Sequence, residues 1–86
     1  MSKYYVYILK SDLGFHYIGQ TSNLADRLNR HNSNRSTFTK NKGHWEIAAC
    51  LELPTRSAAV QLESKLKGLK NFSKALEYIL QLSKIR

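Results

Sequence analysis

The stretch YYVYILKSDLGFHYIGQTSNLADRLNRH, residues 4–31, constrains the fold more than any other part of the chain. Residues 4–10 are mainly aromatic, aliphatic and β-branched, which predicts a strand with apolar side chains on both faces. Ser, Asp and Gly in residues 11–14 predict a turn, and residues 16–20 predict a second strand that returns antiparallel to the first. A helix over about residues 23–31 is expected next, because Thr, Ser and Asn directly before it can cap it. The chain therefore begins with a strand–turn–strand–helix unit.

One more strand is predicted in the middle of the chain. Residues 32–43 are polar and basic, which is typical of a loop. Residues 45–53 alternate in hydrophobicity and predict a third strand with one buried face. The side chains expected on that face are Trp45, Ile47, Ala49, Leu51 and Leu53.

Two helices are predicted in the last third of the chain. Thr55 or Ser57 can cap a helix over about residues 57–67, and Gly68 is a natural C-terminal stop. Ser73 can open the last helix. The apolar stripe expected on this last helix is Leu76, Ile79 and Leu80.

The element order β-β-α-β-α-α predicts an α+β fold, in which helices flank a small three-stranded antiparallel sheet. The chain has 86 residues, so we expect one domain that covers residues 1–86. A domain of this size has a small core, and each buried side chain contributes a large share of it.

The chain is strongly basic, with fourteen Lys and Arg against six Asp and Glu and a net charge of +8. Such a charge attracts polyanions, so nucleic acid is the first candidate partner, ahead of an anionic membrane; solubility is the alternative explanation. No segment approaches the roughly 20 apolar residues that span a bilayer, and the single cysteine, Cys50, excludes an intrachain disulfide. These features predict a cytoplasmic protein without a membrane partner.

Several polar side chains occupy positions where apolar ones are expected. The core-facing stripe of the first helix includes Arg27 and His31 beside two leucines, and that of the second helix includes Glu63. Charges at such positions need partners or water, because desolvation is costly. Taken singly, each is explained equally well as a snorkelling or ion-paired residue, and Arg27 and Glu63 are able to pair with each other. Together with Tyr7 and Tyr17 on the strands, they form a candidate site.

The spacing of these residues resembles that of the GIY-YIG nuclease domain. YVY at residues 5–7 precedes YIG at residues 17–19 by ten residues, counted from tyrosine to tyrosine, and Arg27 and His31 follow in the spacing R-x-x-x-H. Glu63 falls where that family keeps its metal ligand. The resemblance extends over essentially the whole chain and points to the small bacterial members that consist of this domain alone.

Two positions depart from the family pattern. Tyr5 stands where the first motif of the family has glycine. The family often has an asparagine late in the domain, and Asn71 is the nearest candidate for it.

The resemblance implies a metal-dependent endonuclease that hydrolyses phosphodiester bonds of DNA, with structure-selective or weakly specific substrate choice. One divalent cation, Mg²⁺ or Mn²⁺, would be held mainly by Glu63. Tyr7 would assist deprotonation of the attacking water, and Arg27 would contact the scissile phosphate. Tyr17 and His31 would orient the phosphate, the water and Tyr7 by hydrogen bonds.

Basic residues outside the motif are candidates for contact with nucleic acid. The expected set is Arg27, Arg30, Arg35, Lys40 and Lys42. The lysines near the C-terminus are explained either as DNA contacts or as a solvated helix face: Lys65, Lys67, Lys70 and Lys74. DNA is the expected partner and RNA the alternative, and a protein partner would supply targeting.

Two other functions fit the same residues. A binding module of the same fold would hold nucleic acid without cleaving it, and would share the salt dependence of the nuclease but not its need for metal. An interaction domain whose charge is incidental would show no salt-sensitive affinity for DNA.

Overall fold

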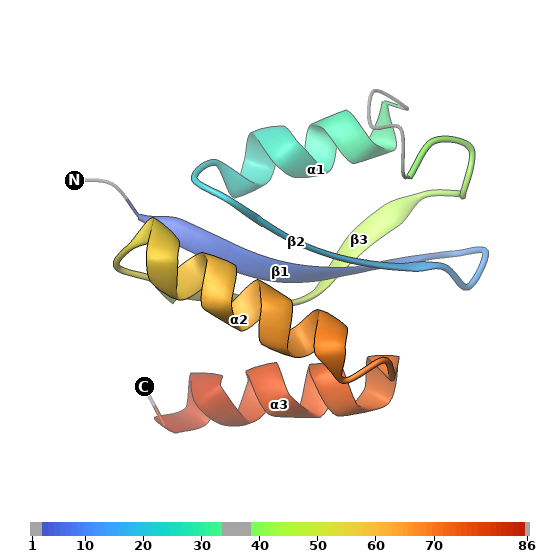
Figure 1. Ribbon diagram of the computed structural model, residues 1–86. Coiled ribbons are helices and arrows are strands. Elements are labelled where there is room, and N and C mark those ends of the chain that lie inside the picture. The colour runs from blue at the N-terminus through green and yellow to red at the C-terminus, as the bar shows by residue number, and fades with distance from the viewer. Residues whose placement is uncertain (1–2, 34–38, 86) are drawn as a thin grey trace.

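The computed structural model describes residues 3–33 and 39–85 and confirms the expected element order and α+β fold. A three-stranded sheet carries helices on both faces (Figure 1). The elements are β1 Tyr4–Ser11, β2 His16–Thr21, α1 Leu24–Asn32, β3 Trp45–Leu53, α2 Arg56–Gly68 and α3 Phe72–Ile85.

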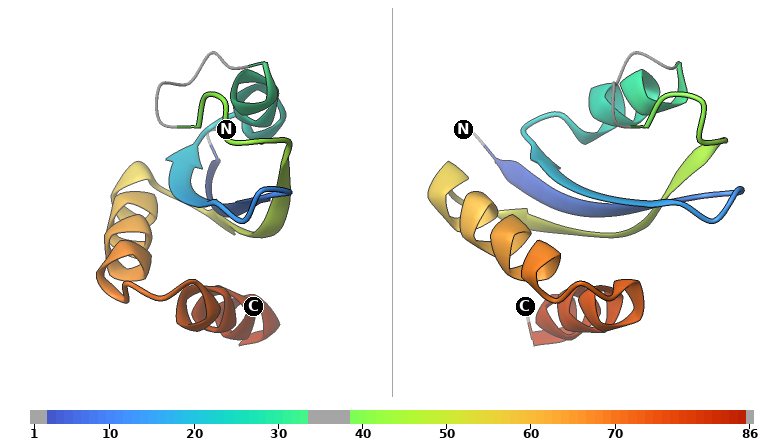
Figure 2. Two further views of the ribbon diagram at one scale, coloured as in Figure 1. Left: turned by 90° about the vertical axis from the view of Figure 1, so that its right-hand side faces the viewer. Right: turned by 45° about the vertical axis from the view of Figure 1, so that its right-hand side comes forward.

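The central strand of the sheet is β1. The strand order is β2-β1-β3, and both pairings are antiparallel, as the sequence predicted for the first hairpin. Helix α1 lies over one face, while α2 and α3 cover the other (Figure 2). The apolar character of both faces of β1 follows from this arrangement, because each face is covered by helix.

Each face of the sheet has its own core. Val6 and Ile8 belong to the larger core with residues of α2 and α3, whereas Tyr7 and Leu9 belong to the smaller core under α1. All four side chains are essentially inaccessible. The alternation of β1 therefore places Tyr7 on the α1 face, where the first-helix stripe also points.

The expectation that one face of β3 carries all five apolar residues is wrong. Ile8 pairs with Ala49 while Leu9 pairs with Ile47, so Ala48 is an extra residue that forms a β-bulge. Ala49 and the apolar residues after it face the larger core, but Trp45 lies in the smaller core under α1. The bulge shifts the alternation by one residue, and it brings the indole of Trp45 beneath the candidate site.

The helix starts are fixed by side-chain caps. The side chain of Asn23 accepts from the backbone N–H of Asp26 at the start of α1, and Thr55 caps α2 in the same way. The expected cap of the last helix, Ser73, is wrong, because the helix already begins at Phe72. The Asn71 side chain instead accepts from the backbone N–H of Lys74 at 3.0 Å.

The end of α2 also differs from the expectation. The helix continues through Gly68, with Leu69 as the C-terminal cap residue, and the left-handed backbone falls on Lys70, whose φ is 53°. On α3, Leu80 is 45% exposed and does not belong to the core stripe, whereas Ala75 and Ile79 are buried. In the described ranges, no helix is long and apolar enough to cross a membrane.

Candidate active site

The site is organised by the pairing of Tyr7 with Gly19 across β1 and β2. Cross-strand partners share a face, so the phenol of Tyr7 lies on the same side as the hydrogen of Gly19. A Cβ atom on Gly19 would lie 2.7 Å from the hydroxyl oxygen of Tyr7 and 2.9 Å from its Cζ. The glycine of the YIG motif therefore leaves the space through which the buried phenol reaches across the edge strand.

The hydroxyl of Tyr7 reaches His31 at the end of α1. Its oxygen lies 3.3 Å from Nε2 of His31, and Nδ1 of His31 lies 2.7 Å from Oγ1 of Thr39. All three side chains are 1% exposed. The positive guanidinium of Arg27 acts on the Tyr7 hydroxyl and lowers its pKa. Of the two neutral tautomers of His31, we assign the one with Nδ1–H, in which Nδ1 donates to Thr39 and Nε2 accepts from the hydroxyl of Tyr7.

Tyr17 completes an aromatic cluster on the α1 face. It is two residues before Gly19 on β2 and therefore points to the same side as Tyr7. Its ring centroid lies 4.8 Å from that of His31 and 6.2 Å from that of Tyr7. Tyr17 is half-buried, so the cluster has one edge that reaches solvent.

The protonation states at the site follow from burial and charge. Burial raises the pKa of Tyr7 well above its usual value, and the nearby Tyr17 adds to this shift, while Arg27 opposes it. Burial lowers the pKa of His31, and the positive charge of Arg27 lowers it further. Tyr7 is thus a neutral phenol and His31 a neutral imidazole at physiological pH.

Helix α2 brings Glu63 to the same region. The helix packs on β2 and β1, and the charge of Glu63 contributes to the raised pKa of Tyr7. Its side chain is 21% exposed, and its Oε2 accepts from Nζ of Lys67 at 2.6 Å. Within the described part of the chain, the ion pair of Glu63 is this one, and the expected alternative of a pair with Arg27 is not formed.

The carboxylate of Glu63 suits a hydrated, hard cation such as Mg²⁺. Across residues 3–33 and 39–85, no three His, Cys, Asp or Glu side chains gather into a group that could hold a metal ion by themselves. Mg²⁺ needs fewer protein ligands than such a group supplies, because it keeps several waters and is commonly bound by one or two carboxylates together with substrate phosphates. Glu63 is part-exposed, and its charge acts on Tyr7 strongly enough to raise the pKa of that phenol, so it fits that pattern.

Three structural partners of the site were not predicted from the sequence. Thr39 accepts from His31 through its side chain and, through its backbone carbonyl, from Nε1 of Trp45 at 3.2 Å. The side chain of Asn32 bonds to both the N–H and the C=O of Trp45, at 2.6 and 3.0 Å. The position of Asn32 next to His31 at the helix end was the one available signal, since Thr39 belongs to a polar loop without a pattern.

The other predicted nucleic-acid contacts lie on the surface. Arg30 is exposed and pairs with Asp26 at 3.1 Å, Lys40 is exposed, and Lys42 lies over the ring of Phe15. Arg35 lies outside the described residues.

Asn71, the candidate for the asparagine that the family often has late in the domain, uses its side chain to cap α3.

Comparison with known families places this geometry in context. Residues 3–76 match the GIY-YIG catalytic domain. The chain belongs to the GIY-YIG family. GIY-YIG domains are nuclease domains, so a nuclease is the general class of activity that membership supports.

Two UPF0213 proteins are among the proteins similar to this chain. The chain is 33% identical to the UPF0213 protein OB0043 of Oceanobacillus iheyensis over 73 residues, which covers 84% of this chain and 85% of the relative. It is 30% identical over 67 residues to the UPF0213 protein BH0048 of Halalkalibacterium halodurans, covering 77% and 71%. The solution NMR structure of the UPF0213 protein BH0048 from Bacillus halodurans superimposes with a TM-score of 0.55 at 28% identity, covering 93% of this chain and 84% of that one. These names state no activity, substrate or metal.

Proposed function

We propose that the protein is a metal-dependent endonuclease that hydrolyses phosphodiester bonds of DNA. The observation that carries the proposal is the hydrogen-bonded chain from Tyr7 through His31 to Thr39, together with the charges of Arg27 and Glu63, both of which act on the pKa of Tyr7. Hydrolysis needs a proton acceptor for the attacking water, a cation at the phosphate and help for the leaving oxygen. The five residues supply one candidate for each of these tasks.

The proton acceptor is the pair formed by Tyr7 and His31. A lone buried phenol is a poor base, because burial raises the pKa of Tyr7 and disfavours its anion. A neutral His31 removes this difficulty: as water gives its proton to Oη of Tyr7, the phenol passes its own proton to Nε2 of His31. The imidazolium then formed keeps its Nδ1–H bond to Thr39. We thus assign to His31 a proton-accepting role in addition to the positioning role first expected.

Arg27 couples phosphate binding to this proton transfer. Without substrate, its charge opposes protonation of His31, because it lowers the pKa of that imidazole. A phosphate bound by the guanidinium would neutralise this charge, so the imidazolium would become easier to form when substrate is present. Tyr17, at the solvent edge of the cluster, is placed to hydrogen-bond to the same phosphate.

Glu63 is the residue that would hold the divalent cation, Mg²⁺ or Mn²⁺. When bound, such an ion supplies positive charge for the phosphate and the leaving oxygen. Glu63 pairs with Lys67 here, so its carboxylate must exchange that ammonium for the cation. The pair is part-exposed, and exposed i,i+4 ion pairs stabilise a helix by only about 0.3–0.5 kcal/mol, so replacing the ammonium by the cation costs little free energy.

The surface charge supports a polyanionic substrate. The net charge of +8 favours electrostatic capture of DNA, to which Arg30, Lys40 and Lys42 would contribute through phosphate contacts. Phosphate contacts carry no sequence information, so we expect weak sequence specificity and propose that a partner protein directs the enzyme to its targets.

A plasmid-nicking assay tests the proposal. The wild type should convert supercoiled DNA to nicked and linear forms with Mg²⁺ or Mn²⁺ and not with EDTA. Glu63→Gln and Arg27→Ala should each reduce the rate by 10²-fold or more. Glu77→Gln, an exposed carboxylate on α3, is the matched control and should leave the rate unchanged. Activity that survives both site substitutions would contradict the assignment.

The ion pair between Glu63 and Lys67 favours one alternative, a domain that binds nucleic acid without cutting it, because the expected metal ligand already has a cation. This alternative predicts salt-sensitive DNA binding and no cleavage of DNA or RNA at any Mn²⁺ concentration. Gel-shift and cleavage assays on the same oligonucleotides separate the two functions.

A further inference from the structure

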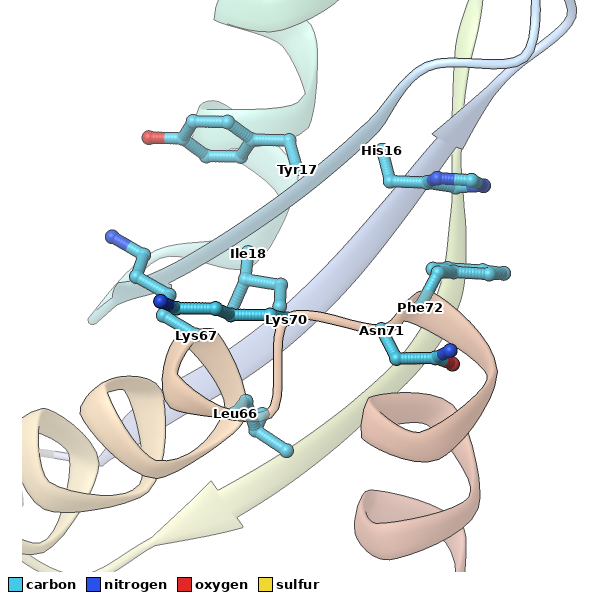
Figure 3. A pocket seen from close by; sticks show the side chains of 8 residues that line it. All are labelled: His16, Tyr17, Ile18, Leu66, Lys67, Lys70, Asn71 and Phe72. Atoms are coloured by element: carbon cyan, nitrogen blue, oxygen red, sulfur yellow. The ribbon is translucent and has the colours of Figure 1, made fainter.

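A pocket of about 340 Å³ opens next to the candidate active site, between the edge strand β2 and the turn from α2 to α3 (Figure 3). Its volume falls within the roughly 300–1,000 Å³ typical of small-ligand sites. Tyr17, which belongs to the aromatic cluster, also lines this pocket. Tyr17 therefore borders both the pocket and the aromatic cluster at which we locate the scissile phosphate.

One end of the pocket is cationic. Lys67, whose ammonium pairs with Glu63, and Lys70 both line it, and Figure 3 shows their amino groups below Tyr17. Lys70 has φ of 53°, a conformation that favours Gly or Asn over other residues. The chain therefore keeps an ammonium group at a position where the backbone alone would favour Gly or Asn.

The other end of the pocket is aromatic. His16 and Phe72 stack with their ring centroids 3.6 Å apart and an interplanar angle of 11°. Figure 3 shows this pair at the end of the pocket away from the lysine amino groups. Ile18 supplies an apolar wall between the two ends.

A cationic end joined to an aromatic end matches one chemical class, a nucleotide. Ammonium groups bind phosphate, and aromatic side chains provide surfaces on which any nucleobase packs. A base that is paired within a duplex cannot enter a pocket at the protein surface, because both of its faces are stacked and its edge is bonded.

We propose that this pocket binds one unpaired nucleotide of the DNA substrate, with the phosphate at Lys67 and Lys70 and the base at His16 and Phe72. The inference rests on the proposed endonuclease function and names the substrate class of the same site. It follows that the enzyme prefers DNA in which a nucleotide beside the cleaved bond is unpaired, as at a mismatch, a bulge or a flap, because extrusion of such a base is least costly.

The first test measures binding without metal or cleavage. Thymidine 5′-monophosphate, inorganic phosphate and thymidine are titrated separately into ¹⁵N-labelled protein. The monophosphate should shift the amide signals of Ile18, Lys70 and Phe72, whereas phosphate alone should act at the lysine end and thymidine alone at the aromatic end. Shifts elsewhere, or the same shifts for phosphate as for the nucleotide, would overturn the proposal.

Two variants connect the binding to the pocket. Lys70→Asn removes the ammonium and suits the left-handed backbone, so its thermal midpoint should equal or exceed that of the wild type while nucleotide binding weakens. His16→Ala removes an exposed stacking ring and should weaken binding by about tenfold. Lys74→Gln and His44→Ala are exposed controls outside the pocket and should bind as the wild type does.

The second test compares cleavage of matched duplexes. A duplex with one unpaired nucleotide should be cut about tenfold faster than the fully paired form, and Lys70→Asn and His16→Ala should bring this ratio toward one. Equal cleavage of both duplexes by the wild type would overturn the inference but leave the endonuclease in place. If no DNA is cut, the endonuclease proposal fails, and the titration decides the pocket by itself.

Discussion

The hydroxyl oxygen of Tyr7 lies 2.7 Å from the point that a Cβ atom would take on Gly19. An alanine at this position must displace a buried phenol, and such overpacking typically costs about 1–3 kcal/mol. The displacement also breaks the contact between Tyr7 and His31.

We expect Gly19→Ala to lower DNA cleavage by at least tenfold while the protein remains folded. Cleavage rates and urea unfolding measure the two effects. Gly68→Ala is the matched control: a Cβ atom there meets nothing within 4 Å, and alanine within a helix is favoured over glycine by about 0.5–1 kcal/mol. A Gly19→Ala variant that retains full activity would show that the position of Tyr7 does not matter for the reaction.

The Thr39 hydroxyl provides a second prediction, since it fixes the tautomer of His31. Thr39→Val keeps the shape but leaves the buried Nδ1–H without its acceptor, which costs about 1–3 kcal/mol of stability. Cleavage should fall by tenfold or more, because Nε2 no longer stays reliably unprotonated. Thr39→Ser retains the hydroxyl and should restore most of the rate; if serine behaves as valine does, the hydroxyl is not what orients the ring.

The lowered pKa of His31 predicts how the stability of the protein depends on pH. Burial lowers its pKa in the folded state below the ordinary value of 6.5, so below about pH 6.5 the unfolded chain binds more protons than the folded one. The free energy of unfolding should therefore decrease as pH falls from about 6.5 toward the folded-state pKa, and His31 should have no such effect above pH 7. Urea unfolding of the wild type and His31→Gln at pH 7.5 and 5.5 measures this. The substitution should reduce the loss at pH 5.5, whereas the exposed-residue control His44→Ala should retain it.

The ion pair between Lys67 and Glu63 predicts that removal of the lysine raises the affinity for Mn²⁺. Its ammonium lies 2.6 Å from the carboxylate of Glu63, so it competes with a divalent cation for the same oxygen. Lys67→Met keeps the helix and removes the competitor, and Mn²⁺ should then broaden the amide signals around Glu63 at several-fold lower concentration. Lys65→Met, which removes an ammonium that lies over Tyr78 rather than beside Glu63, should leave the titration unchanged. A lower Mn²⁺ affinity in Lys67→Met would mean that the lysine supports the metal site.

Much of the fold was predictable because its local signals are strong. The aromatic and β-branched residues of β1 favour a strand, and the caps Asn23 and Thr55 mark helix starts wherever the helices later pack. The polar residues on the helix stripes were equally visible, because a charge at a core-facing position breaks a regular pattern. These signals predicted the element order and identified Arg27, His31 and Glu63 as candidates.

The errors have a common cause in contacts between distant segments. The bulge at Ala48 depends on how β3 meets β1, and nothing in the alternation of β3 itself predicts it. The left-handed conformation fell on Lys70 rather than on Gly68, since the packing of α3 against α2 and β3 decides where the turn lies. Leu80 was assigned to the core from its spacing, but the orientation of α3 leaves it exposed.

The sequence by itself determined the family, the secondary-structure order and the residue types available for chemistry, because these depend on local pattern and spacing. Only the tertiary structure decided what those residues contact. It joined His31 to Tyr7 and Thr39 and opened a pocket beside Tyr17, because each of these contacts joins side chains from different elements. Hydrogen bonds and ion pairs act over a few ångströms, so their partners are known only when the segments are placed in space.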